Sequence, residues 1–287
     1  LAAAPEPGGP DRARALLGAG AITGLLGDPS RAGQWLEESV RAARHLGDPL
    51  LPRALSWLAL IRGQLGDRAE GIELAEASIR LSRANGDRWQ LAGSLLDLGF
   101  LTAHTGDHPA ARALYEEGLA LFRELRDPWG TGTALGLLGA NAALTGDLSR
   151  SVNCYEESLA RFREIDDRLR GATSLMSLGM VALRQEDVAW AEHLFRDALR
   201  RGRDLGASQV VAVSLLGAAV VAARREKRER AHALFAAAEA LRTRSGYSVP
   251  LLARHEYDRL RAEYPLPGPS PALPEQEAIT LALQEPG

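Results

Sequence analysis

The feature that most constrains the fold of this chain is a motif that recurs about every forty residues. The stretch HTGDHPAARALYEEGLALFRELRD, residues 104–127, is followed by LTGDLSRSVNCYEESLARFREIDD, residues 144–167. Aligned on its glycine-aspartate pair, the motif occurs at Gly27-Asp28, Gly66-Asp67, Gly106-Asp107 and Gly146-Asp147, and more weakly at Glu186-Asp187 and Glu226-Lys227. A second mark keeps the same spacing at Asp48, Asp87, Asp127 and Asp167, continued by Ala207 and Tyr247. Two turn signals per period indicate two helices per repeat, and six periods fill residues 11–247.

The two helices of each repeat have different patterns. The first, for example residues 91–106, is apolar on most sides, as expected of a helix that packs against neighbours on several faces. The second, for example residues 110–125, is amphipathic, with Ala111, Tyr115 and Phe122 on one face and Glu116 and Glu124 off it. The pattern therefore predicts a helical hairpin with one inner and one outer member.

Small residues recur at one phase of the first helix, which holds Gly20, Ala59, Gly99, Gly139, Gly179 and Ala219. A glycine inside a helix costs about 0.8–1 kcal/mol relative to alanine, so its recurrence implies a compensating contact. The simplest contact is a close helix crossing, where a larger side chain would overpack. The second helix has its own small positions at Ala32, Gly71, Ala111, Ser151, Ala191 and Ala231, followed four residues later by Leu36, Ala75, Tyr115, Tyr155, Phe195 and Phe235.

This order of small and aromatic residues, with Leu98-Gly99, Leu138-Gly139 and Leu178-Gly179 on the first helix, resembles the tetratricopeptide repeat. The sequence departs from that family in two respects. Leucine, as at Leu95 and Leu135, replaces the early tryptophan of the family, and the period near 40 exceeds the usual 34. The longer period, the Gly-Asp turns, the linkers GDRWQ and RDPWG and the segment 231–250 are similar to the C-terminal sensor regions of bacterial STAND-type signal-transduction ATPases and LuxR-type regulators. The match is poor over residues 264–274.

The expected fold is all-α: a right-handed superhelical solenoid of about six helix-turn-helix repeats followed by C-terminal capping helices. Residues 1–10 are interpreted as a linker, and the residues from 248 to 287 as a capping helix, a proline-rich connection and a short terminal helix. The expected repeats span 11–48, 49–87, 88–127, 128–167, 168–207 and 208–247. The resemblance implies that the segment follows an NTPase or another effector domain in a larger protein.

Composition narrows the function classes. The net charge is −3 and Lys227 is the only lysine, so no global field favours nucleic acid or anionic lipid. The single cysteine, Cys154, allows no intrachain disulfide and favours a reducing, cytoplasmic location. No apolar run approaches membrane-spanning length. No phosphate-binding glycine loop, metalloprotease motif or nucleophile elbow occurs, so we expect no enzyme activity, no cofactor and no metal.

Individual candidates for chemistry are better explained by structure. Tyr115 and Tyr155 share a phase with Phe195 and Phe235, which carry no hydroxyl, so all four rings are expected to serve packing. Trp89 and Trp129 are also in phase with each other and are interpreted as contacts between repeats. His104 and His108 have a spacing that could hold a metal on one helix face. They flank a Gly-Asp turn, however, so we do not expect them to share a face.

The remaining candidate is the concave surface that stacked hairpins present by construction. The groove-facing positions of the family correspond here to Trp57, Leu60, Leu96, Asp97, Phe100, His104, Leu137, Ala140, Met176, Met180, Leu183, Arg184, Val213, Leu216, Val220 and Arg224. This face is more apolar than a solvated surface, which favours the binding of a peptide or protein. The alternative is that a tight superhelix, or a terminal segment that folds back, buries these side chains.

Asn141 interrupts the apolar pattern of a first helix, and we include it in the candidate site. A buried amide must meet a backbone group or a ligand, because leaving it unsatisfied costs about 1–3 kcal/mol. Both possibilities remain open from the sequence.

The leading functional hypothesis is a sensor or protein-interaction module that binds a peptide or protein and relays the event to an effector domain. The alternative is a freestanding scaffold or adaptor. The adaptor type that grips a carboxylate with lysine, arginine and asparagine is disfavoured, because the expected groove is mostly apolar and Lys227 lies outside it.

Overall fold

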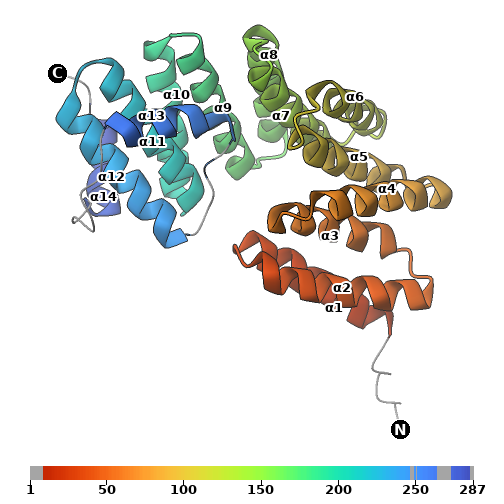
Figure 1. Ribbon diagram of the computed structural model, residues 1–287. Coiled ribbons are helices and arrows are strands. Elements are labelled where there is room, and N and C mark those ends of the chain that lie inside the picture. Colours follow the sequence, from red (N-terminus) through yellow and green to blue (C-terminus); the bar gives the residue numbers. More distant parts are fainter. Residues whose placement is uncertain (1–8, 246–248, 250, 264–272, 285–287) are drawn as a thin grey trace. The chain divides into compact units, whose positions relative to one another are not determined.

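Figure 1 shows the computed structural model of the chain, which describes residues 9–245, 249, 251–263 and 273–284. Most of the expected linker 1–10, Tyr247, Tyr264 and most of the proline-rich connection lie outside the described residues. Fourteen α-helices and one short 3₁₀-helix make up the regular structure of the described residues, which include no strand. Among these helices, none combines the length and the apolar character needed to cross a lipid bilayer.

The first twelve helices form consecutive pairs, as the repeat predicts. In chain order they are α1 (Pro10–Leu25), α2 (Pro29–Leu46), α3 (Leu51–Leu65), α4 (Arg68–Asn85), α5 (Arg88–Ala103), α6 (His108–Glu124), α7 (Pro128–Leu144), α8 (Leu148–Glu164), α9 (Arg168–Arg184), α10 (Val188–Asp204), α11 (Ser208–Arg224) and α12 (Arg228–Ser245). We call the odd-numbered members first helices and the even-numbered members second helices. The predicted all-α array of helix-turn-helix repeats is therefore confirmed.

The chain divides into two compact units, residues 1–137 and 138–287, and the division falls within α7. In the N-terminal unit the pairs α1/α2, α3/α4 and α5/α6 pack as hairpins, and α1, α3 and α5 touch in succession. In the C-terminal unit α9/α10 and α11/α12 form hairpins, and α9 contacts α11. First helices therefore line up beside first helices within each unit.

The Gly-Asp motif is a helix stop followed by a helix start. Gly66, Gly106 and Gly146 adopt φ values of 101°, 92° and 88°, a left-handed conformation that glycine reaches without steric cost. The aspartate that follows often caps the next helix, as where Asp107 accepts a hydrogen bond from the backbone N–H of Ala110 at 3.0 Å. The same cap recurs at Asp147 and, where the motif is weaker, at Asp187.

The recurring glycines mark close helix crossings. A Cβ atom built on Gly99 would lie 2.6 Å from Cε1 of Tyr115, and one on Gly179 would lie 2.7 Å from Cε1 of Phe195. The aromatic ring of the second helix therefore rests directly on the glycine of the first. This confirms the close approach predicted from the repeat phase.

The segment after α12 folds back on the C-terminal unit. The 3₁₀-helix η1 (Leu251–Ala253) contacts α9, and α13 (Arg254–Glu263) contacts α11. The last helix, α14 (Glu275–Leu283), contacts α10, α11 and α12. These three elements have no counterpart in the N-terminal unit.

Candidate functional site

In the N-terminal unit, five of the predicted site residues remain at least partly open to solvent. We call them the first-helix row: Trp57 and Leu60 on α3, with Asp97, Phe100 and His104 on or directly after α5. Phe100 is 38% exposed, and its ring lies 4.3 Å from that of His104 between centroids. Nδ1 of His104 lies 2.8 Å from the carbonyl oxygen of Phe100, which holds the imidazole against the aromatic ring.

Asp97 brings a carboxyl group into this otherwise apolar row. The hydroxyl of Ser56 donates a hydrogen bond to Oδ2 of Asp97 at 2.5 Å. Burial raises the pKa of the Asp97 carboxyl to about 7, and the hydrogen bond from Ser56 opposes that rise. The row therefore carries a carboxyl group whose charge changes near neutral pH.

Below Asp97 lies a buried serine network that sequence reasoning missed. The hydroxyls of Ser78 and Ser94 lie 2.7 Å apart, and Ser78 also donates to the carbonyl of Pro52 at 2.6 Å. Ser94 in turn lies 3.4 Å from Ser56. A signal is present in the sequence, because Ser56, Ser78 and Ser94 interrupt apolar helix faces, but nothing in their spacing indicates that the three hydroxyls meet. Buried hydroxyls of this kind satisfy one another and fix the helices that carry them.

A cluster of aromatic and cationic groups lies at the beginning of α5. The guanidinium of Arg53 stands over the ring of Trp89 at 5.3 Å, and its Nε donates to Oε1 of Gln90 at 3.3 Å. Trp89 stacks on Trp129 with centroids 6.3 Å apart and meets Phe122 edge-on at 6.1 Å. Trp89 thus packs between successive repeats, although it stays 38% exposed.

The two other predicted residues of this unit, Leu96 and Leu137, differ in their exposure. Leu96 is buried, and its side chain lies against Gly118 of α6. The prediction for Leu96 is therefore wrong, since its position on the helix directs it into the hairpin rather than toward solvent. Leu137 is half-buried.

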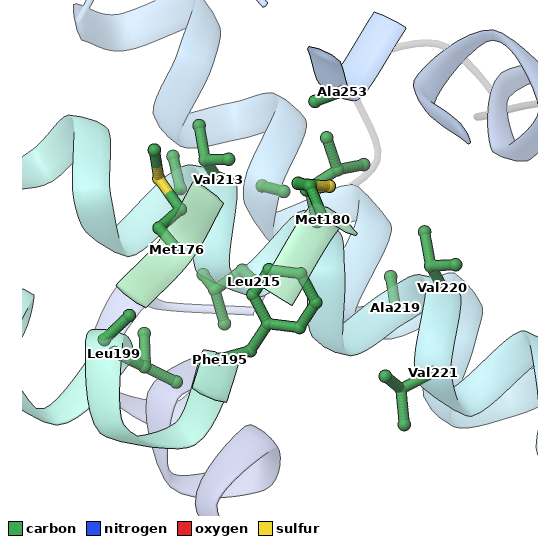
Figure 2. Packing of buried hydrophobic residues seen from close by; sticks show 14 of the residues in the cluster. Met176, Met180, Phe195, Leu199, Val213, Leu215, Ala219, Val220, Val221 and Ala253 are labelled. Carbon is green, nitrogen blue, oxygen red and sulfur yellow. The ribbon is translucent and has the colours of Figure 1, made fainter. Parts of the chain in front are cut away.

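In the C-terminal unit, the corresponding residues form a core. Met176, Met180, Leu183, Val213, Leu216 and Val220 are all less than one-tenth exposed. They belong to one apolar cluster with Val249, Ala253, Tyr257 and Leu260. Figure 2 shows Met176, Met180 and Val213 with Ala253 of η1 close by. The expectation of an exposed face at these six residues is corrected: here the terminal segment folds back and covers them.

Polar contacts hold this cover in place. Nη2 of Arg224 on α11 lies 3.2 Å from Oε1 of Glu256 on α13. The same carboxylate forms a second ion pair, with Arg259, at 3.0 Å. The ring of Tyr257 meets Phe235 edge-on at 5.9 Å, and its hydroxyl donates to Glu239 at 3.0 Å. Arg184 donates to the backbone carbonyl of Ala143 at 2.6 Å. The predicted site residues Arg184 and Arg224 therefore serve intramolecular contacts in this structure.

Asn141 lies in the C-terminal unit and is buried. It takes part in an interaction within the chain, and its backbone carbonyl accepts a hydrogen bond from the hydroxyl of Thr145 at 3.0 Å. Its assignment to a ligand site stays a prediction.

The repeated tyrosines are packing residues. Tyr115 and Tyr155 are nearly fully buried, each against a glycine of the neighbouring first helix. Burial raises the pKa of both phenols above their ordinary value, so neither hydroxyl is suited to proton transfer near neutral pH. Tyr155 is also hydrogen-bonded to Ser177, whereas the equivalent first-helix position of the previous repeats holds Leu137 and Asp97.

The remaining single candidates lie apart from one another. His104 follows α5 whereas His108 begins α6, so the pair is divided between two helices. Cys154 lies on α8 and is half-buried.

The chain resembles known proteins in both its sequence and its fold. The family model described as tetratricopeptide repeat matches residues 50–124, 90–164 and 130–204. No curated protein sequence matches the chain.

Three solved structures share the fold. A Rap protein complexed with Competence and Sporulation Factor is 11% identical with a TM-score of 0.68, and the alignment covers 96% of this chain and 77% of that one. A signal transduction ATPase with numerous domains (STAND) and a tetratricopeptide repeat sensor, from Pyrococcus horikoshii, is 15% identical with a TM-score of 0.63 over 95% of this chain and 41% of that one. BtubC from P. vanneervenii is 20% identical with a TM-score of 0.62 over 83% and 94%. At these identities the likeness extends to the fold alone.

Proposed function

The chain belongs to the tetratricopeptide-repeat family, and on that premise we propose that it is a non-catalytic module that binds a peptide or protein segment through the first-helix row. The ligand contacts Trp57, Leu60 and Phe100 with apolar side chains and places polar groups near Asp97 and His104. Aromatic side chains supply much of the binding energy at such surfaces, because they bury a large area at a small cost in conformational entropy.

The observation that carries this proposal is that side chains at equivalent positions of the first helices differ in their exposure to solvent. Leu60, Phe100, Met180 and Val220 stand at the same point of four repeats, and the half-buried Ala140 stands there in the repeat between Phe100 and Met180. Met180 and Val220 are sealed in a core, whereas Leu60 and Phe100 remain partly open. A phenylalanine kept 38% exposed between partly open apolar neighbours supports a binding surface rather than a core.

We further propose that the module is the sensor segment of a larger cytoplasmic signal-transduction protein of bacterial type, with an NTPase or other effector domain preceding it. The similar STAND protein, of which the chain spans 41%, carries a tetratricopeptide repeat sensor. The similar Rap protein was solved in complex with Competence and Sporulation Factor. A freestanding scaffold is the second candidate, favoured by BtubC, of which the chain covers 94%.

The test starts from peptides selected against the chain out of a random displayed library. Affinity of a selected peptide for the parent chain and for Trp57→Ala/Phe100→Ala is then measured by fluorescence anisotropy. We expect the double variant to lose about tenfold or more in affinity, since two aromatic anchors are removed. The matched control is Leu169→Ala, which removes an apolar side chain that is 49% exposed in the C-terminal unit. Equal binding by the folded double variant and the parent would refute the first-helix row as the site.

A further inference from the structure

The second helices of the C-terminal unit already hold one short helix, α14. Ala278, Ile279 and Ala282 of α14 are buried in the apolar cluster of this unit. At the C-terminal end of α14, Arg196 donates to the carbonyl of Leu283 at 2.5 Å and Arg230 donates to that of Gln284 at 3.0 Å. At its N-terminal end, Glu275 pairs with Arg244 at 2.6 Å. The binding of α14 therefore combines an apolar face with a cationic anchor at each end.

The charges of this groove match the charges of α14. A cavity at the α14 groove is lined by Arg196, Arg225, Lys227 and Arg230, with Glu192 as the single carboxylate. The free carbonyls at the C-terminal end of a helix carry partial negative charge, which arginines stabilise. The first turn of α14 carries Glu275 and Glu277, which suit Arg244.

One repeat earlier, a second cavity of about 380 Å³ lies between α8 and α10. Four of its nine lining residues correspond, at a spacing of forty, to residues of the α14 groove: Leu159 to Leu199, Leu178 to Ala218, Glu156 to Arg196 and Trp190 to Arg230. Because α8, α9 and α10 have the same bounds as α10, α11 and α12 shifted by forty residues at almost every end, the two cavities are the same place in consecutive repeats. No described element of the C-terminal unit occupies the second one in the way that α14 occupies the first.

The anchoring charges of the second cavity are inverted. Glu156 stands where Arg196 holds the C-terminal end of α14, and Asp204 stands where Arg244 holds its N-terminal end. Trp190 replaces Arg230, and Asp197, a further carboxylate of the rim, is paired with Arg201 at 3.0 Å. The rim also holds Arg163 and the imidazole of His193. Asp204 is paired with Arg203 at 2.9 Å, an exposed ion pair that a cation of the ligand can replace. The α14 groove therefore favours negative charge at the ends of a bound helix, whereas this groove favours positive charge there.

We propose that the α8/α10 groove is a second docking site, which takes a short amphipathic helix with an apolar face and basic residues at its ends. The apolar face covers the half-buried Trp190, beneath which Leu159 and Leu178 are buried, and arginine or lysine side chains meet Glu156 and Asp204. The occupant is a partner protein rather than a second copy of α14, because α14 carries acids at its N-terminal end and would oppose both carboxylates. This site is independent of the first-helix row.

Two synthetic peptides test the proposal directly. The acidic probe is residues 273–284, acetylated and amidated, and the basic probe is the same peptide with Glu275→Arg, Glu277→Arg and Gln284→Arg. Each carries a fluorophore and is titrated with the full chain by anisotropy. We expect the basic probe to bind at least about tenfold more tightly than the acidic probe. No preference, or a preference for the acidic probe, would overturn the proposal.

Charge reversal locates the binding. Glu156→Arg/Asp204→Arg, at two exposed positions, makes the groove resemble that of α14 and should reverse the preference toward the acidic probe. The matched control is Glu116→Arg/Glu124→Arg, which makes the same change in net charge on α6, with Glu116 one period before Glu156. This control should leave the preference unchanged. If it weakens the basic probe as much as the groove variant does, the attraction is non-specific and the proposal fails.

The first-helix row needs its own control. Trp57→Ala/Phe100→Ala should bind the basic probe as the parent chain does. Loss of the basic probe in this variant would place it on the first-helix row and overturn the α8/α10 assignment. In that case the proposed function would stand while this inference fails.

Discussion

The first helices of the two units belong to the same repeat, yet equivalent side chains on them are exposed in one unit and buried in the other. Phe100 in the N-terminal unit is 38% exposed, whereas Met180 and Val220, at the equivalent position of later repeats, are 3% and 0% exposed. The hairpins beneath these residues are built alike, with a ring on a glycine in both units. The difference arises from η1 and α13, which follow the last repeat and pack on the first helices α9 and α11 of the C-terminal unit. A repeat position therefore acquires its role from what lies over it, not from the repeat itself.

The largest expected effect compares Met180→Ala with Phe100→Ala. Met180 is enclosed by the core of the C-terminal unit, so its truncation leaves a cavity and should lower the free energy of unfolding by about 2–5 kcal/mol. Phe100 is already partly hydrated, and its truncation should cost about 1 kcal/mol. Urea unfolding followed by far-ultraviolet circular dichroism measures both. Equal losses in the two variants would mean that the two faces are covered alike.

The next effect tests whether the hairpins themselves are equivalent. Gly99→Ala and Gly179→Ala each place a methyl group against an aromatic ring and should each cost about 1–3 kcal/mol. Gly93→Ala is the control, because a Cβ atom there meets nothing within 4 Å, and it should gain about 0.5–1 kcal/mol from helix propensity. A cost confined to one unit would contradict the equivalence of the hairpins.

The smallest effect concerns Asp97, whose repeat-equivalent positions Leu137 and Ser177 are neutral. Burial raises the pKa of this carboxyl to about 7, so the folded state binds a proton that the unfolded state has released over the range from about pH 4 to pH 7. Stability should fall as the pH rises through that range. Asp97→Asn removes the penalty and should stabilise the chain more at about pH 8 than at about pH 5, by roughly 1 kcal/mol, because solvent screens this half-buried group.

Thermal unfolding of Asp97→Asn at the two pH values measures this gain. Asp258→Asn, at an exposed aspartate of α13, serves as the control and should show no such dependence on pH. A gain for Asp97→Asn that is the same at both pH values would show that the carboxyl is not held against ionisation by the fold.

The sequence predicted the parts of the fold that depend on local patterns. The Gly-Asp spacing located the turns, because glycine reaches the left-handed region and aspartate caps a helix within a few residues of chain. The phase shared by Gly99, Gly139 and Gly179 located the helix crossings, because a close contact repeated in space must repeat in sequence. The all-α array of paired helices and its family followed from these two signals.

The candidate site was predicted less completely, for two physical reasons. The repeat identified which residues lie on the free side of the first helices, but Leu96 turned into its hairpin and six residues of the C-terminal unit were buried. The cover over those six comes from Val249, Ala253, Tyr257 and Leu260, which follow no period, so no alignment of the chain on itself could find it. The serine network below Asp97 was not predicted, because each serine by itself is compatible with an ordinary helix position. Only the fold brings the three hydroxyls together.

By itself, the sequence determined the helices, their pairing and their family, because turns, caps and packing phases depend on neighbours within one or two repeats. Only the tertiary structure decided which faces are left for a partner. The terminal segment covers one set of first-helix side chains, and α14 fills one second-helix groove. No described element of the C-terminal unit fills the equivalent groove one repeat earlier. These outcomes depend on contacts between segments as much as 87 residues apart, as between Arg196 and Leu283, and such contacts leave no periodic mark in the chain.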